Sequence, residues 1–181
     1  NGTTGIAVGM ATEIPPHNLG EVCAGALHLL ENPEATIEEL MEFIKGPDLP
    51  LGATIYGKQD ILEAYQTGKG KCVVQATAEC TEDKIIITDL PYQVNKADLQ
   101  EKIGILVKDK KIDGIKDLKD VSNKNGIKII IETKRDVSPE VVLNHLYRLT
   151  DLQSKVYFNL LALVNRGRQP ELLNLKRILR E

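Results

Sequence analysis

The chain has 181 residues, of which 42% are hydrophobic and 27% are charged, and its formal net charge is −3. This composition is typical of a globular protein, and it excludes a collagen, a disordered tail and a small disulfide-rich scaffold. The three cysteines lack the C-x-x-C spacing of zinc sites, so we expect no metal site, and this cysteine usage suits a reducing compartment. No apolar run approaches the ~18 residues of a membrane span, so we expect no membrane contact. Because the chain begins at Asn1 and stops within a helical pattern, we interpret it as an internal piece of a longer protein.

The first part of the chain is expected to be a loop followed by a capped helix. Three glycines and a Pro-Pro pair predict a loop with short extended pieces over residues 1–16. Asn18 is typical of a helix N-cap, with Glu21 as its capping-box partner. The helix that they begin is expected to end near Asn32-Pro33.

A second short helix comes next, and the pattern then changes. Thr36 with Glu39 is another capping-box signature, and Gly46-Pro47 is expected to end the helix that follows it. Ala53–Tyr56 is predicted to be a strand, and residues 60–65 to form one or two helical turns.

Gly68 ends those turns, and two runs rich in β-branched residues follow, Lys71–Cys80 and Lys84–Asp89. The polar residues 81–83 between them predict a hairpin. Asn95 is then expected to cap a helix whose apolar positions recur at helical spacing. These positions are Leu99, Ile103, Leu106 and Val107.

The pattern continues with a second hairpin and another helix. Residues 115–121 and 127–133 flank a turn that ends in Asn125-Gly126, a pair typical of hairpins. Ser138-Pro139 begins a helix, with the serine as cap and the proline at the first helical position. The buried face of this helix is predicted to carry Val142, Leu146 and Leu149.

Residues 155–164 are predicted to be one further strand, and the chain is expected to be helical again from Asn174. The order strand, helix, strand, strand, helix over residues 84–149 resembles a split β-α-β arrangement. We therefore predict an α+β fold, in which helices pack on one face of an antiparallel sheet, beside an N-terminal loop and helical segment.

Motifs for catalysis, nucleotide binding and metal binding are not found. The nearest approach to a phosphate-binding loop, Thr67–Lys71, lacks the first glycine and the hydroxyl that follows the lysine. The three histidines are far apart and have no ligand-like neighbours. The residues alone therefore predict a module without catalytic, cofactor-binding or metal-binding residues.

Charge is distributed unevenly along the chain. Residues 1–66 hold two lysines against ten acidic side chains, whereas residues 95–136 and residues 166–181 each have a surplus of three positive charges. Such clusters are either solvated surface or local phosphate-binding patches, and the mean charge does not decide between these interpretations.

The first twelve residues are the most informative for function. They offer backbone N–H groups, the hydroxyls of Thr3 and Thr4, and the large aliphatic side chain of Ile6. Amides and hydroxyls suit contacts with phosphate or sugar. For Ile6 two interpretations remain open: a core residue, or an exposed side chain that inserts into a partner.

Several motifs, in the same order, resemble the A subunit of bacterial type IIA topoisomerases, the family of DNA gyrase and topoisomerase IV. The longest is the run NGTTGIAVGMAT-x-IPPHNL at residues 1–19. The others are GPD-x-P at 46–50, AY-x-TG-x-GK at 64–71, LPYQVNK at 90–96, Asp120-x-Ser122, VLN-x-LY at 142–147 and NLK at 174–176. The resemblance covers essentially the whole chain.

The resemblance implies an internal segment of the subunit that breaks and rejoins DNA. It implies that Ile6 wedges between base pairs and bends the duplex, with Thr3 and Thr4 as phosphate or sugar contacts beside it. Lys69 and Lys71 are further candidates for contacts with the DNA backbone. The family's catalytic tyrosine and its neighbouring arginine are expected upstream, so no residue of this chain is predicted to be catalytic and the segment alone is expected to be inactive.

The resemblance also supplies expectations for partners and domains. The parent would be an ATP-dependent isomerase of the bacterial cytoplasm and nucleoid, built from an A-subunit homodimer and B subunits that supply ATP hydrolysis and Mg²⁺. Residues 1–45 would be a DNA-facing loop and two helices adjoining the winged-helix region, residues 46–170 the α/β tower domain, and residues 171–181 the root of a coiled-coil arm. We interpret the chain as a gyrase-type segment; a topoisomerase IV segment and a protein-assembly module with Ile6 in its core are the alternatives.

Overall fold

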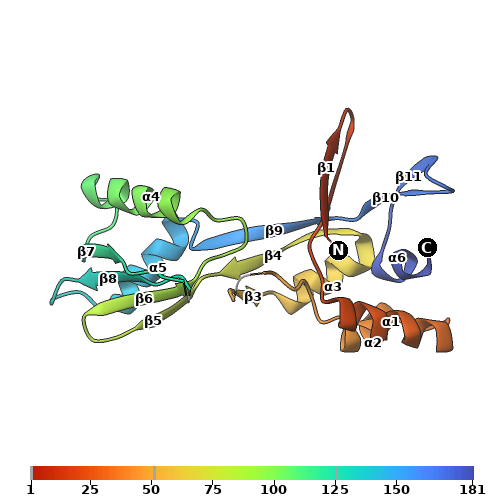
Figure 1. Cartoon of the computed structure of the whole chain (residues 1–181), viewed down its shortest axis with the longest axis horizontal. Helices are drawn as coiled ribbons and strands as arrows, with labels where there is room; N and C mark the ends of the chain where they lie inside the picture. The colour runs from red at the N-terminus through yellow and green to blue at the C-terminus, as the bar shows by residue number, and fades with distance from the viewer. Residues whose placement is uncertain (1, 51, 125) are drawn as a thin grey trace. The chain divides into compact units, whose positions relative to one another are not determined.

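The computed structural model describes residues 2–50, 52–124 and 126–181, so that Asn1, Leu51 and the predicted turn residue Asn125 lie outside the described part. Helices alternate with antiparallel strands through these residues (Figure 1), which confirms the α+β class. The contacts group the chain into two compact units. Unit 1 comprises Asn1–Leu49, Gly57–Cys72 and Lys155–Glu181, and unit 2 comprises Pro50–Tyr56 and Val73–Ser154.

Unit 1 combines two hairpins with four helices among its described residues. Its elements are β1 (Thr3–Ala7), β2 (Met10–Ile14), α1 (Leu19–Glu31), α2 (Ile37–Phe43), α3 (Lys58–Thr67), β10 (Leu161–Val164), β11 (Gln169–Leu172) and α6 (Leu175–Arg180). Two strands, β4 (Lys69–Gln75) and β9 (Gln153–Asn159), run through both units. The core of unit 1 contains Tyr65, whose ring meets that of Phe158 edge-on, with 5.9 Å between the ring centroids.

The N-terminal segment is more regular than the sequence predicted. Residues expected to be mostly loop form the antiparallel β1–β2 hairpin, in which Thr3 pairs with Ile14 and Ala7 with Met10. The two residues between the strands include Gly9, whose φ of +81° is costly for any other residue. The glycines had suggested a loop, but a two-residue turn with one well-placed glycine is what a tight hairpin needs.

The side chains predicted to cap α1 and α2 do so. The side chain of Asn18 accepts hydrogen bonds from the backbone N–H groups of Gly20 and Glu21. Thr36 and Glu39 make both bonds of the capping box, at 3.3 and 3.0 Å. These bonds satisfy amides that the first turn of a helix leaves without partners, which fixes where α1 and α2 begin.

Unit 2 is a four-stranded antiparallel sheet of order β5-β6-β8-β7, with a short strand, β3, paired to the end of β4. The elements are β3 (Thr54–Tyr56), β5 (Thr77–Cys80), β6 (Lys84–Asp89), α4 (Lys96–Lys108), β7 (Ile115–Asp120), β8 (Ile129–Thr133) and α5 (Pro139–Leu149). The side chain of Asn95 caps α4 as predicted. Both predicted hairpins, β5–β6 and β7–β8, are formed.

Both helices of unit 2 pack on one face of this sheet, as predicted. Alternate residues of the two central strands, Ile85, Ile87, Ile129 and Ile131, are fully buried. They form one hydrophobic cluster with α4 and α5. Ile86 and Ile130, which pair across the same strands, are only half-buried because successive side chains of a strand point to opposite faces.

Two long strands of the prediction are each divided in the structure. The run 71–80 breaks at Ala76, whose N–H donates to the carbonyl of Leu152 and whose carbonyl accepts from the Tyr147 hydroxyl. The run 155–164 breaks at Leu160, whose N–H donates to the carbonyl of Gly68. In both places the backbone N–H bonds to a residue outside the strand pairing, which interrupts the strand. The prediction of single strands was therefore wrong. The hairpin β10–β11 was not predicted.

The helix α5 differs from its prediction in two details. It begins at Pro139 as expected, but the side chain of Ser138 makes no capping bond and its hydroxyl instead donates to the carboxylate of Glu140. Val142 and Leu146 are buried, whereas Leu149 is 41% exposed. Leu149 is the last residue of the helix.

None of the described helices is long and apolar enough to cross a membrane. The domain boundaries expected after residue 45 and after residue 170 stay predictions.

Candidate nucleic-acid interface

The β1–β2 hairpin presents apolar side chains to solvent at its tip. Ile6 is 89% exposed, Val8 is fully exposed and Met10 is 43% exposed. Ile6 pairs with Ala11 across the hairpin, and this small neighbour leaves its side chain uncovered. The interpretation of Ile6 as a core residue is therefore wrong. Single exposed apolar residues are common, but three on one hairpin tip form a surface suited to insertion.

The two predicted threonine contacts lie on opposite faces of β1. Because side chains alternate along a strand, Thr4 shares the face of Ile6, whereas Thr3 points to the other face. Both threonines are exposed. The hairpin therefore brings Thr4 together with Ile6, and Thr3 is available only to a ligand that reaches around the strand.

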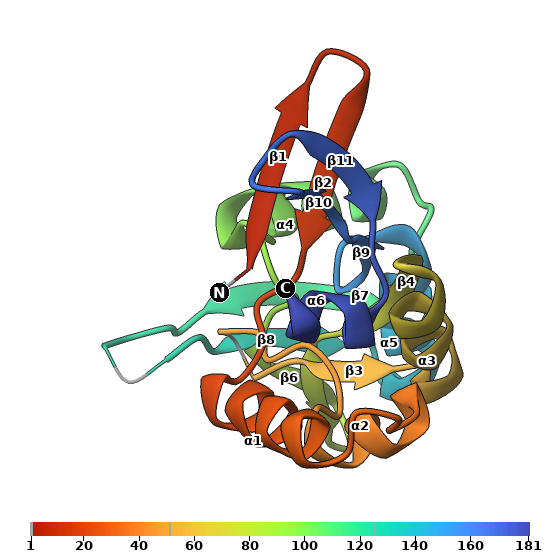
Figure 2. The same ribbon diagram turned by 90° about the vertical axis from the view of Figure 1, so that its right-hand side faces the viewer.

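A groove of about 240 Å³ separates the β1–β2 hairpin from the β10–β11 hairpin, and Figure 2 shows these hairpins next to each other. Its lining is mostly apolar. The lining residues are Gly5, Ile6, Ala7, Met10, Ala11, Thr12, Leu161, Ala162, Leu163 and Pro170. The wedge candidate Ile6 thus stands at the wall of an apolar groove shared by two hairpins.

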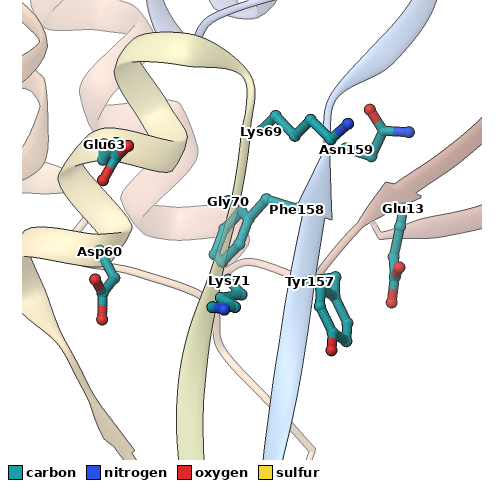
Figure 3. A pocket seen from close by; sticks show the side chains of 9 residues that line it. All are labelled: Glu13, Asp60, Glu63, Lys69, Gly70, Lys71, Tyr157, Phe158 and Asn159. Carbon is teal, nitrogen blue, oxygen red and sulfur yellow. The ribbon is translucent and has the colours of Figure 1, made fainter.

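The lysines predicted to contact DNA lie in a different place, on β4. Lys69 and Lys71 line a cavity of about 450 Å³. Three carboxylates line the same cavity, those of Glu13, Asp60 and Glu63, the last two from α3 (Figure 3). Among the described residues neither ammonium forms an ion pair. The neighbouring carboxylates nevertheless make the local potential less favourable for phosphate.

Comparison with known proteins identifies the family. The model of the family that comprises the A subunits of DNA gyrase and topoisomerase IV matches residues 1–181. The chain belongs to this family of gyrase and topoisomerase IV A subunits.

Three relatives illustrate the match, and each is named as the A subunit of DNA gyrase. The relative from Clostridium acetobutylicum is 56% identical over 99% of this chain and 22% of its own length. Those from Haemophilus influenzae and Pseudomonas aeruginosa are 54% and 53% identical, over 99% of this chain and 21% and 20% of their own lengths. The chain spans about a fifth of the length of the curated relatives it matches.

Two motifs that carry the resemblance to the gyrase and topoisomerase IV A subunits meet in unit 2. Lys96, the last residue of LPYQVNK, places its ammonium 2.7 Å from a carboxylate oxygen of Asp120. The same carboxylate accepts from the backbone N–H of Ser122 at 2.9 Å. These bonds hold the pKa of Asp120 well below its usual range. The contact anchors α4 to the end of β7, so in this family segment these motifs serve the fold.

Another family motif, IPPHNL, places His17 inside unit 1. Its Nδ1 lies 2.7 Å from the carbonyl oxygen of Pro15, and its Nε2 lies 2.6 Å from the Tyr65 hydroxyl. A carbonyl oxygen can only accept, so Nδ1 carries the proton and Nε2 of the neutral ring accepts from the tyrosine. Burial lowers the pKa of His17, although the Pro15 carbonyl and two nearby carboxylates oppose this effect.

We expect the stability of the chain to decrease as the pH falls from about 7 to about 5, in part through His17. Because the pKa of His17 in the folded chain lies below 6.5, its contribution is complete above that value and is lost as the pH falls from there through the lowered pKa. Urea unfolding of the chain and of a His17→Gln variant, at several pH values in this window, measures it. The free energy of unfolding of the variant should depend less steeply on pH. Equal pH dependence of the two proteins would contradict the role assigned to His17.

Sequence reasoning missed two features of this gyrase/topoisomerase IV family segment. One is the exposed tip formed by Val8 and Met10 around Ile6. The other is the loop that joins β10 to β11, which carries Arg166 and Arg168. The turn-forming residues Asn165 and Gly167, directly after the predicted strand 155–164, are the signal that could have revealed this hairpin.

Proposed function

We propose that this chain is the DNA-bending segment within the A subunit of a type IIA topoisomerase, with Ile6 as its wedge. In this proposal the β1–β2 hairpin enters the duplex at one base step and unstacks it. Thr4 contacts the sugar or phosphate next to that step, Thr3 contacts the backbone from the other face of the hairpin, and Lys69 and Lys71 act farther away. The rest of the segment supports the hairpin.

The exposure of Ile6 carries the proposal. A side chain that is 89% exposed contributes little to the fold, but it gains free energy when it is buried in a partner. Complete burial of an isoleucine is worth about 1.5–3 kcal/mol. Unstacking a base step costs a few kcal/mol, so insertion of Ile6 offsets a large part of that cost, and contacts with the bent duplex supply the remainder.

The parent in this proposal is an enzyme of the bacterial cytoplasm that passes one duplex through a transient break in another. Two A subunits and two B subunits form it, and the B subunits supply ATP hydrolysis and Mg²⁺. Among the described residues of this chain no group of three or more His, Cys, Asp or Glu side chains is placed to hold a metal ion. The breakage chemistry is assigned to residues outside this segment, and the same assignment covers a gyrase and a topoisomerase IV parent.

The test is an Ile6→Ala substitution in the full-length A subunit, in complex with Mg²⁺ and its B subunit. End-to-end energy transfer across a doubly labelled duplex of about 30 base pairs reports the bend, since smooth bending of this length costs several kcal/mol. We expect the transfer to fall to the value of free duplex, while salt-dependent binding of the duplex remains.

Two controls separate a wedge from a packing residue. Ile6→Val keeps a branched side chain and should keep most of the bend. Ile105→Ala removes an exposed aliphatic side chain from α4 in unit 2 and should leave the bend unchanged. If the folded Ile6→Ala enzyme bends DNA as the parent does, Ile6 is not the wedge and the proposal is wrong.

A further inference from the structure

We propose that the β10–β11 hairpin is a second DNA-contacting element, in which Arg166 and Arg168 bind backbone phosphates beside the step that Ile6 opens. The inference rests on the proposed function, because it takes the bent duplex as the ligand. It adds a phosphate-binding site to the proposed wedge. It also assigns the main electrostatic contact with DNA to the two arginines and not to Lys69 and Lys71.

The loop between β10 and β11 holds its arginines away from the fold. Three consecutive residues, Asn165, Arg166 and Gly167, have positive φ values of 52°, 58° and 78°. For residues other than glycine this backbone region costs roughly 1 kcal/mol or more. A hydrogen bond from the N–H of Arg168 to the carbonyl of Val164 closes the loop at 3.1 Å. The hairpin thus maintains an unfavourable backbone conformation at an arginine whose side chain lies in solvent.

Both arginines are exposed, and among the described residues neither guanidinium has an ion-pair partner. Arg177, also in unit 1, differs in this respect, because it pairs with Glu181 one helical turn away at 3.2 Å. Unpaired guanidiniums keep all their donors for a ligand, and their planar fork matches two phosphate oxygens.

The apolar groove connects this loop to the wedge. Leu163 on β10 and Ile6 on β1 line the same groove of about 240 Å³. Arg166 follows Leu163 by three residues, so at most about 10 Å of chain separates it from the groove wall. Successive bases on one DNA strand rise by about 3.4 Å, so this length corresponds to about three base steps. A duplex kinked at Ile6 therefore passes within reach of the loop.

Comparison with the β4 lysines favours the arginines as the phosphate site. Lys69 and Lys71 share their cavity with Glu13, Asp60 and Glu63. The groove beside the arginines has no acidic residue in its lining, and Leu163, which is 60% exposed, stands there instead. The hairpin can therefore contact sugars through Leu163 and phosphates through its two arginines. Both kinds of contact suit the DNA next to an unstacked base step.

The test measures how the affinity for a linear duplex depends on salt, for the full-length A subunit in complex with its B subunit. Each lost phosphate contact reduces the slope of log K against log salt by about 0.9. Because the enzyme holds two copies of the A subunit, the double variant Arg166→Ala/Arg168→Ala removes four contacts and should lose about 3.6 from the slope. Between 50 and 200 mM salt the parent should weaken by roughly a hundredfold more than the double variant does. Arg166→Lys/Arg168→Lys should retain the parent slope.

A matched control is Lys124→Ala, which removes an exposed cation from the turn between β7 and β8 in unit 2 and should leave the slope unchanged. An unchanged slope in the double alanine variant overturns the inference, as does an equal loss in the Lys124→Ala variant, which would indicate diffuse electrostatics. The bend separates the two proposals. If Ile6→Ala abolishes the bend and the double alanine variant keeps the parent slope, the wedge stands and the second site is wrong. If the double alanine variant loses slope while Ile6→Ala keeps the bend, the phosphate site stands without the wedge.

Discussion

Replacement of Gly68 by alanine is expected to lower the free energy of unfolding by about 3–5 kcal/mol, which is large for a single methyl group. Gly68 ends α3 with a φ of +79°, and an added Cβ would lie 2.3 Å from the carbonyl oxygen of Leu173. The backbone has no room to shift, because the N–H of Gly68 donates to Ala64 and its carbonyl accepts from Leu160. Alanine would therefore add steric overlap to the cost of its backbone conformation.

The matched control for this prediction is Gly9→Ala. Gly9 has almost the same φ, +81°, but an added Cβ there would meet nothing within 4 Å. The control isolates the conformational cost, which is about 1–2 kcal/mol. Urea unfolding followed by far-ultraviolet circular dichroism measures both variants. Equal destabilisation by the two substitutions would show that the close approach of Leu173 is relieved at no cost.

The second large effect is expected at Ile131, in the centre of the unit 2 sheet. Ile131 is fully buried and belongs to the cluster that joins the sheet to α4 and α5. An Ile131→Ala substitution removes most of the side chain and leaves a cavity, for which the typical loss is about 2–5 kcal/mol. The midpoint of urea unfolding should fall accordingly, with an unchanged dependence on denaturant.

The neighbouring residue supplies the control for Ile131. Ile130 has the same side chain on the same strand, but it faces away from the helices and is half-buried. We expect Ile130→Ala to cost about 1 kcal/mol, the typical value for a point substitution. A larger loss at Ile130 than at Ile131 would mean that the outer face of the sheet, and not the helix-covered face, holds the main core.

Local signals in the sequence predicted the parts of the fold that local interactions decide. The starts of α1, α2 and α4 follow from Asn18, Thr36 and Asn95, because a cap is a contact between residues two or three positions apart. The two breaks in the long strands could not be predicted in this way. They depend on Leu152 reaching Ala76 and on Gly68 reaching Leu160, and such distant partners leave no periodic signal.

The candidate interface was predicted only in part, for a related reason. The resemblance identified Ile6, but the residue type alone favoured a core position, and only the register of β1 with β2 shows the side chain in solvent. Lys69 and Lys71 were chosen from a local cluster of positive charge. Their acidic neighbours come from other elements, so the sequence around the lysines did not reveal them. The roles of these residues toward DNA stay predictions.

The division of β4 and β9 between the two units has a topological consequence. The chain leaves unit 1 after Cys72 and returns at Lys155, so unit 2, apart from the short piece Pro50–Tyr56, is an insertion in a host domain. The two ends of the insertion lie together, since the Gln75 side chain donates to that of Gln153 at 2.5 Å. Adjacent ends are the condition under which domains are exchanged, shortened or transplanted without disturbing their host. Unit 2 can therefore change in length and sequence while the hairpins of unit 1 keep their register.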